Sequence, residues 1–231
     1  MVWLCGVDGF KSRWCAVLRN FDTGELRARV VSFQDLLELP ENPAIIAIDV
    51  PIGLLDVTPP GGRTCERLAR EIVGAHRARS VISTVGRAAL AATTRAEADL
   101  VSRAAGGIGI SAHSWGLKDK LQEVDDMITP ALQQVIHEVH PELSFREMAG
   151  RPLSHSKKTP QGEQERLATL IRSFPKESVT NTPPALRAGR GDFFDACAAL
   201  WTAGRIYRGT AKRVPDLRVL DAQGLDMAMW F

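Results

Sequence analysis

Two apolar segments of the sequence each end in an aspartate, and this repeated pattern constrains the fold more than any other feature. The first segment covers residues 2–7 and leads into Asp8, and the second covers residues 44–48 and leads into Asp49. An uninterrupted apolar run of this length is typical of a strand that is buried on both faces of a parallel or mixed sheet. Ligands of open α/β sheets bind beyond the carboxyl ends of such strands. We therefore expect Asp8 and Asp49 to lie together at a functional site.

The residues between these two runs predict two further strands and a crossover helix. Residues 13–19 form an apolar run with charged ends, and residues 26–31 alternate between apolar and polar as a half-exposed strand does. Ser32, followed by Asp35, resembles a helix capping box. The resulting β-β-β-α-β order lets the Asp49 strand lie parallel to the Asp8 strand and beside it, because such crossovers are right-handed.

Strand signals nearly vanish after Pro51, which predicts a helical insertion over about residues 52–130. Helical spacing or helix-terminal residues mark the segments 63–74, 94–106, 117–128, 162–174 and 192–207, with a further strand at 135–140 and a short edge strand at 230–231. The predicted fold class is therefore α/β, with a mixed five-stranded sheet, the element order β-β-β-α-β-α-β-α, and one insertion after the fourth strand.

Length and composition predict a single domain over residues 1–231, since one hydrophobic core can serve a chain of this size. No apolar stretch is long enough to cross a bilayer, and Asp8 and Lys11 come too early for a signal peptide, so we expect a cytoplasmic protein. The four cysteines lie in apolar segments without Cys-x-x-Cys spacing, which favours buried thiols. The net charge of +2 does not by itself indicate a nucleic-acid-binding protein.

Carboxylates follow three of the predicted strands and open the last helix. Glu142 follows the strand at 135–140, and Asp192 and Asp195 share one face of the final helix. Carboxylate oxygens are the ligands that Mg²⁺ and Mn²⁺ prefer, and pairs of such ions hydrolyse phosphodiesters. We predict that Asp8, Asp49, Asp192 and Asp195 bind Mg²⁺ or Mn²⁺ and act in catalysis, with Glu142 as a further catalytic candidate.

Each acid also has a structural interpretation. Asp8 before a glycine suits a turn, Asp192 suits a helix cap, and Glu142 could pair with an arginine of the insertion. Asp49 favours the site, because an acid that ends a fully apolar strand would otherwise be buried at a high free-energy cost.

Basic residues form two candidate contacts for phosphate. Arg63, Arg67 and Arg70 lie on one stripe of the helix predicted at 63–74 and could bind phosphates bidentately, although they could equally form a solvated face paired with glutamates. Lys157 and Lys158, in a loop rich in Ser and Thr, are a second candidate.

The order of these motifs resembles that of the predicted ribonuclease-H-like nuclease family, a family of domains of unknown function. The resemblance covers nearly the whole chain and rests on residues 6–9, 48–54, the Arg63/Glu66/Arg67/Arg70 run, residues 111–115, 140–145 and 192–196, and Lys158 with Gly162 and Arg166. It implies an RNase H-like fold and a metal-dependent nuclease. Standard enzymes of this fold carry a glutamate on the first helix, where this chain has Asp35 and Glu38, and related resolvases close with His-x-x-Asp, where this chain has Asp192-x-x-Asp195.

The sequence therefore predicts a nuclease that needs Mg²⁺ or Mn²⁺ and acts on nucleic acid, without distinguishing DNA from RNA. No membrane partner is expected, and a homodimer stays open. One alternative is a non-catalytic module of the same fold that binds nucleic acid or another ligand. Another is an ATP-dependent phosphotransferase, because related folds also open with a strand, an Asp-Gly turn and a hairpin, but those folds need a duplicated second domain.

Overall fold

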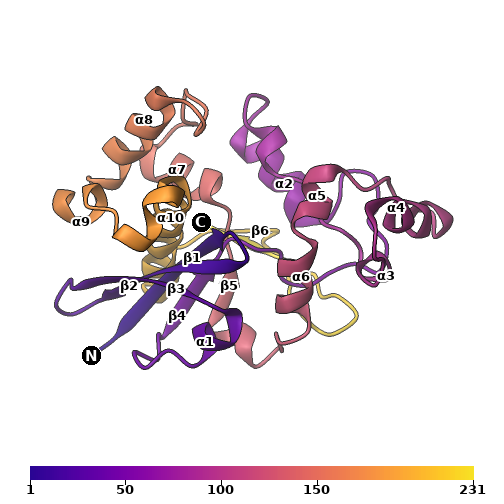
Figure 1. The fold of residues 1–231 in the computed structure, drawn as a ribbon, viewed down its shortest axis with the longest axis horizontal. Coiled ribbons are helices and arrows are strands. Elements are labelled where there is room, and N and C mark those ends of the chain that lie inside the picture. The colour runs from indigo at the N-terminus through magenta and orange to yellow at the C-terminus, as the bar shows by residue number, and fades with distance from the viewer. The chain divides into compact units, whose positions relative to one another are not determined.

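The computed structural model describes residues 1–231, apart from the side chains of Pro184, Arg187 and Ala188. The chain forms two compact units (Figure 1). One, called here the sheet unit, contains residues 1–50, 135–212 and 230–231, and the other, called the insertion unit, contains residues 51–134 and 213–229. The predicted insertion at 52–130 is thus close to the first segment of the insertion unit. The prediction of a single domain stays a prediction, because it depends on whether each unit folds alone.

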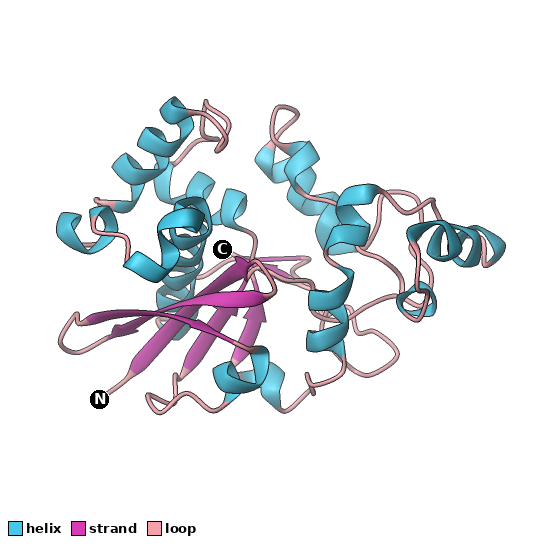
Figure 2. Cartoon of the chain, viewed as in Figure 1, coloured by secondary structure: helices cyan, strands magenta, loops and turns pink.

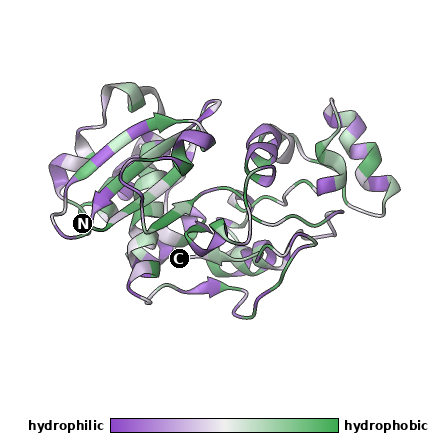
Figure 3. Ribbon diagram, turned by 90° about the horizontal axis from the view of Figure 1, so that it is seen from below, coloured by the Kyte–Doolittle hydropathy of each residue, from purple (hydrophilic) through white to green (hydrophobic). Residues whose placement is uncertain are grey.

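The sheet unit is built on a mixed five-stranded sheet, as the sequence predicts (Figure 2). The strands lie in the order β3-β2-β1-β4-β5, where β1 pairs antiparallel with β2 and parallel with β4. The parallel arrangement of the two aspartate-bearing strands is therefore confirmed. The strand bounds are β1 Trp3–Phe10, β2 Arg13–Asn20, β3 Leu26–Val31, β4 Ile45–Ile48 and β5 Ile136–Glu138. Polar and apolar residues alternate along β3, the half-exposed strand at the edge of the sheet. Purple and green bands of this kind are visible on a strand in Figure 3.

The register of β1 corrects one expectation about Asp8. Val7 pairs with Ile48, and the amide of Asp49 donates to the carbonyl oxygen of Val7 at 2.9 Å, so the two aspartates stand beside each other. Asp8 does not end its strand, however, because β1 continues for two more residues in the hairpin with β2. Only Asp49 follows the last residue of its strand.

Helix α10, Arg190–Tyr207, packs directly on β1 and closes the core of the sheet unit. Gly6 makes this close approach possible. A Cβ atom at this position would lie only 2.1 Å from the backbone nitrogen of Leu200 and 2.2 Å from the carbonyl oxygen of Ala196. The alanines of this helix are buried, and the predicted helix at 192–207 is confirmed with a start two residues earlier.

Among the other helices of the sheet unit, α1 and α8 correspond to predicted segments, whereas α7, α9 and η3 were not predicted. The Ser32–Asp35 capping box is present at the start of α1. Helix α8 begins two residues before the predicted segment, because Thr159 caps it and Pro160 is its first residue. The bounds are α1 Phe33–Leu37, α7 Pro141–Ala149, α8 Pro160–Leu170, α9 Lys176–Thr180 and the 3₁₀ helix η3 Pro184–Gly189.

The insertion unit consists of helices and loops. Three of its helices match the predicted segments, whereas α3 and α5 are too short to show a periodic pattern. The bounds are α2 Thr64–Val73, η1 Ala78–Ser80, α3 Arg87–Leu90, α4 Arg95–Ala104, α5 Ala112–Gly116, α6 Lys118–Asp125 and η2 Leu132–Gln134. The strands β6, Arg213–Val214, and β7, Met229–Trp230, pair with each other, and Trp230 also forms a single parallel bridge with Val139, the residue after β5.

All four cysteines are buried and outside any disulfide, which confirms the prediction of buried thiols. Across the described residues, we find no helix that combines the length and the apolar character needed to span a membrane.

Candidate active site

Asp8 and Asp49 form a pair of neighbouring carboxyls in the sheet unit. Asp8 is 8% exposed, and its Oδ1 accepts a hydrogen bond from the amide of Gly9 at 2.8 Å. Burial raises the pKa of Asp8 well above its ordinary value, and the negative charges of Asp49 and Asp195 raise it further. Burial also raises the pKa of Asp49, although the charges of His140 and Lys157 and a hydrogen bond with Asp8 oppose this rise. Each of the two side chains therefore holds a proton more tightly than an isolated aspartate does.

Asp195 joins this pair from helix α10. The close contact at Gly6 brings the first turns of α10 against β1, and Asp195 is only 1% exposed. Its Oδ2 accepts from the ammonium of Lys157 at 2.7 Å. Its Oδ1 is buried without a hydrogen-bond partner among the described residues, and the nearest recorded cationic atom is Nε of Arg166 at 4.0 Å. A buried carboxylate oxygen in this state is costly unless something binds it.

Asp192 and Glu142 lie at the margin of this group. Asp192 is in the first turn of α10 and half-buried, and its charge raises the pKa of Asp8 less than the charges of Asp49 and Asp195 do. Glu142 opens α7 and forms an ion pair with Arg166, which is 2% exposed and stacks on the ring of Phe145 at 5.2 Å. The structural interpretation of Glu142 thus fits its placement, with a partner on α8 rather than in the insertion.

Lys157 is the site residue that sequence reasoning undervalued. Its ammonium contacts Asp195, and its charge also acts on Asp8 and Asp49, so the pKa of Lys157 is raised above its ordinary value. The family resemblance favours Lys158, but that side chain is exposed, and its backbone amide donates to Ser156 Oγ. Two adjacent lysines in one loop look alike in sequence, and only the path of the loop distinguishes them.

The loop that carries Lys157 is fixed at its base. Glu165 of α8 accepts hydrogen bonds from the amides of Ser154 at 3.0 Å and His155 at 2.9 Å. These bonds hold the pKa of Glu165 at about 2, although its partial burial opposes the shift. Gly162 lets α8 approach the loop, because a Cβ there would lie 1.9 Å from the carbonyl oxygen of Ser156. The position of Lys157 therefore depends on several independent contacts.

The arginine stripe, Arg63, Arg67 and Arg70, lies in the insertion unit, and its guanidinium groups donate hydrogen bonds to nearby backbone carbonyls. Arg63 is 2% exposed, pairs with the fully buried Glu66 at 2.8 Å, and donates to the carbonyl oxygens of Ile52 and Gly53. This placement gives Arg63 a structural role and argues against a phosphate contact.

The other two arginines of the stripe remain closer to solvent. Arg67 is exposed and donates to the carbonyl oxygen of Gly62 at 2.9 Å. Arg70 is half-buried and donates to the carbonyl oxygens of Val81 and Gly61 at 2.7 and 2.6 Å. Both side chains organise the neighbouring loop, and a phosphate contact by either stays a prediction.

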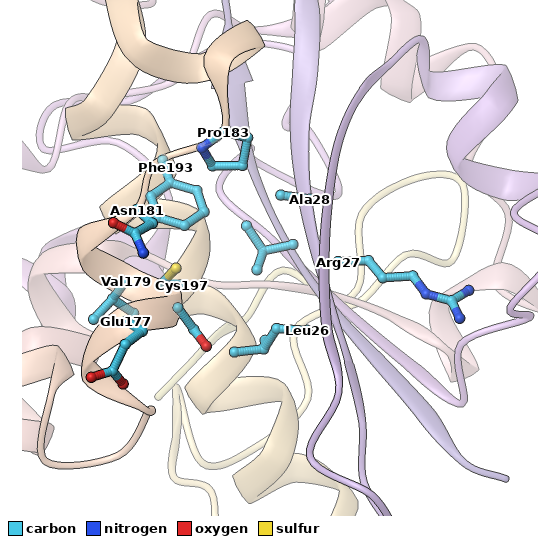
Figure 4. Close-up of a pocket in the computed structure, with 11 residues that line it drawn as sticks. Leu26, Arg27, Ala28, Glu177, Val179, Asn181, Pro183, Phe193 and Cys197 are labelled. Atoms are coloured by element: carbon cyan, nitrogen blue, oxygen red, sulfur yellow. The ribbon is translucent and has the colours of Figure 1, made fainter.

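A cavity of about 210 Å³ lies elsewhere in the sheet unit, between β3 and the α9–α10 region (Figure 4). Leu26 and Ala28 face Phe193 and Cys197 across it, whereas the side chain of Arg27 points away. None of Asp8, Asp49, Asp192 and Asp195 lines it, so the carboxylate group and the cavity are separate features.

The three carboxylates suit a hard divalent cation, although they do not form a ready-made coordination shell. No set of three or more His, Cys, Asp or Glu side chains among the described residues already stands close enough to hold a metal ion. The donor chemistry nevertheless fits Mg²⁺ or Mn²⁺, since Asp8, Asp49 and Asp195 offer only oxygen atoms and Oδ1 of Asp195 has no hydrogen-bond partner. The fit is therefore one of donor chemistry, and metal binding at this group stays a prediction.

Comparisons with known proteins give one match. Neither the curated proteins nor the solved structures contain a match to this chain. A family model described as "Protein of unknown function (DUF429)" matches residues 6–218, which include every acid described above. The matched segment covers far more than half of the sequence, and the chain therefore belongs to the DUF429 family.

Proposed function

We propose that this protein is a metal-dependent nuclease, which hydrolyses phosphodiester bonds of nucleic acid at the group formed by Asp8, Asp49 and Asp195. The observation that carries the proposal is the convergence of three carboxyls from β1, β4 and α10, where Oδ1 of Asp195 is buried without a hydrogen-bond partner. Asp195 pairs with Lys157 through Oδ2 only, and the buried Oδ1 beside two further carboxyls favours an additional ligand of positive charge.

The fold supports the same proposal. Three antiparallel strands precede a parallel fourth strand, and a helix with an acidic first turn closes the sheet unit. This is the arrangement that the resemblance to ribonuclease-H-like nucleases implies, and we extend the proposal to an RNase H-like fold for the sheet unit. The phosphotransferase alternative is less favoured, because the described residues contain one five-stranded sheet and not a duplicated pair.

Within this proposal the three aspartates hold Mg²⁺ or Mn²⁺, and bound ions of this kind polarise a phosphoryl oxygen and lower the pKa of a coordinated water. Asp8 and Asp49 are fixed by adjacent strands, and Asp195 is fixed by the helix packed on Gly6. Rigid elements of this kind hold ligands more precisely than loops do. The charge of Asp192 contributes to the raised pKa of Asp8. Glu142 holds Arg166 in place through their ion pair.

The test combines a metal titration with a cleavage assay on labelled single-stranded, duplex and junction DNA and RNA. We expect Mn²⁺ to bind the wild type and to support cleavage of at least one substrate, and Asp8→Asn and Asp195→Asn to lose both properties. Asp216→Asn, which changes an exposed carboxylate in the insertion unit, is the matched control and should behave as wild type. Cleavage that persists in EDTA, or in either site variant, would contradict the proposal.

A non-catalytic binding module is the second candidate, and one observation favours it. Lys157 already supplies a positive charge to Asp195, Asp8 and Asp49, so part of the negative charge is compensated within the chain. A module of this kind would bind nucleic acid by filter or fluorescence assays with no cleavage product, and its affinity would not depend on Mn²⁺.

A further inference from the structure

The ammonium of Lys157 is the positive charge in closest contact with the carboxylate group. It lies 2.7 Å from Oδ2 of Asp195 and acts electrostatically on Asp8 and on Asp49. His140 acts on Asp49, and Arg166 lies 4.0 Å from Oδ1 of Asp195 while its ion pair is with Glu142. Lys157 therefore supplies a charge at the place where a bound cation would supply it.

One ammonium cannot balance the whole group. Three ionised aspartates would carry three negative charges against the single positive charge of Lys157. A divalent cation would balance the charge better, but it would repel the ammonium if both contacted Asp195.

The chain offers a way for Lys157 to leave without rearranging the fold. Its loop is anchored through Glu165 and Gly162. The lysine side chain itself is 49% exposed, and a flexible four-carbon stem carries its ammonium. The ammonium can therefore move from Asp195 into solvent by rotation about side-chain bonds, while the backbone stays in place.

We propose that Lys157 and the divalent cation compete for Asp195, so that the lysine occupies the metal-free site and withdraws when the cation binds. This inference rests on the proposed metal site and adds an internal counterion to it. A withdrawn ammonium beside a bound cation would be available to a substrate phosphate, which makes Lys157, rather than Lys158, the phosphate contact of this loop.

The first test uses the wild-type protein and measures lysine acylation by mass spectrometry with and without Mn²⁺. Release from Asp195 should raise the modification rate of Lys157 by about tenfold, the factor that corresponds to losing one charge-assisted hydrogen bond. Lys158 is exposed in the same loop and serves as the internal control, with an unchanged rate.

The second test measures Mn²⁺ affinity by calorimetry. Lys157→Met should bind Mn²⁺ about tenfold more tightly than the wild type, because the competing charge is gone. Lys157→Arg keeps the charge and should stay near the wild-type value, as should Lys158→Met. If Lys157→Met does not fold, the acylation measurement on the wild type decides.

The outcomes separate this inference from the proposed function. Mn²⁺ binding with an unchanged acylation rate of Lys157, or with equal or weaker affinity in Lys157→Met, overturns the competition and leaves the metal site standing. An absence of Mn²⁺ binding in both wild type and Lys157→Met overturns the competition and the metal site together. Binding in Lys157→Met but not in the wild type supports the competition in its strongest form.

Discussion

At the scale of single residues, the buried acid Asp8 should weaken folding rather than support it. Its folded-state pKa lies above the unfolded value of 3.8, so the folded protein holds the proton more tightly than the unfolded chain does. This advantage is complete below pH 3.8 and is lost as the pH rises through the folded-state pKa. At neutral pH the charged form carries the cost of burial and of repulsion from Asp49.

We predict that Asp8→Asn raises the melting temperature of the metal-free protein at pH 7 by about 2–4 °C, which corresponds to roughly 1 kcal/mol for a chain of this size. Asparagine keeps the shape and the acceptor for the amide of Gly9 while removing the charge. Melting curves of both proteins from pH 4 to pH 8 check this, and the difference should shrink toward pH 4. Equal melting temperatures of the wild type and Asp8→Asn at pH 7 would show that burial and charge repulsion at Asp8 do not destabilise the folded protein.

The adjacent placement of Asp8 and Asp49 could be predicted from the sequence, because each follows an apolar run that is typical of a buried strand. Lys157 could not be selected over Lys158 in the same way. Its role depends on which of two adjacent side chains the loop turns toward Asp195, and that choice is made by Glu165 and Gly162. Long-range packing of this kind leaves no periodic pattern in the sequence.

At the scale of elements, the contact between α10 and β1 depends on the absence of a side chain at Gly6. We predict that Gly6→Ala destabilises the protein by about 1–3 kcal/mol, since the added methyl group meets helix backbone that cannot rotate away. Because Asp195 stands on that helix, the stabilisation by Mn²⁺ should fall as well. Chemical denaturation with and without Mn²⁺ measures both effects.

The matched control is Gly191→Ala in the same helix, where a Cβ atom meets no other atom within 4 Å. This variant should be neutral or slightly more stable, because alanine favours the helix. If Gly6→Ala were equally neutral, α10 would not be held against the sheet as closely as described.

Helix α8 holds the neighbouring loop through a carboxylate, and this connection should depend on pH. The pKa of Glu165 is about 2 in the folded protein against an ordinary value of 4.5, so its contribution is present above pH 4.5 and is lost as the pH falls toward 2. We predict that Glu165→Gln lowers the stability by about 1 kcal/mol at pH 7 and by progressively less below pH 4. Urea unfolding at a series of pH values gives the comparison, and a difference that is constant with pH would contradict an ionic role.

Elements with a strong local pattern were predictable, including the five-residue α1, whereas the nine-residue α7 was not predicted. The buried strands, α10 and the capping box at Ser32 match expectation because burial and capping impose local residue choices. Helices α3 and α5 have five residues or fewer and are set by the loops around them. Their existence depends on tertiary contacts rather than on propensity.

At the scale of the whole molecule, the insertion unit is completed by a segment far along the chain. The side chain of Asp221 is fully buried and accepts hydrogen bonds from Arg87 and from the amide of Leu54, and Arg87 also pairs with Asp125 at 2.8 Å. Burial opposes the charged form of Asp221, but these hydrogen bonds lower its pKa. One arginine thus joins three parts of the unit.

We predict that Arg87→Met destabilises the insertion unit by about 3–5 kcal/mol, because it leaves two largely buried carboxylates without their cation. Hydrogen exchange should accelerate in residues 213–229 more than in β1 or α10. Lysine at this position keeps one charge but loses the two-pronged contact and should give an intermediate effect. Unchanged exchange in residues 213–229 would mean that the apolar contacts of this segment suffice.

The division of the chain has a consequence for how the molecule can be taken apart or assembled. The polypeptide passes from one unit to the other at four points, after residues 50, 134, 212 and 229. Neither unit is therefore formed by one continuous stretch of the sequence. A fragment of residues 51–134 would lack Asp221, the partner of Arg87. A protein from which residues 51–134 were deleted would keep residues 213–229 but lose the rest of the insertion unit, on which they pack. Separate expression of either unit would require the chain to be cut at all four points and its segments to be joined anew, once for the insertion unit and twice for the sheet unit.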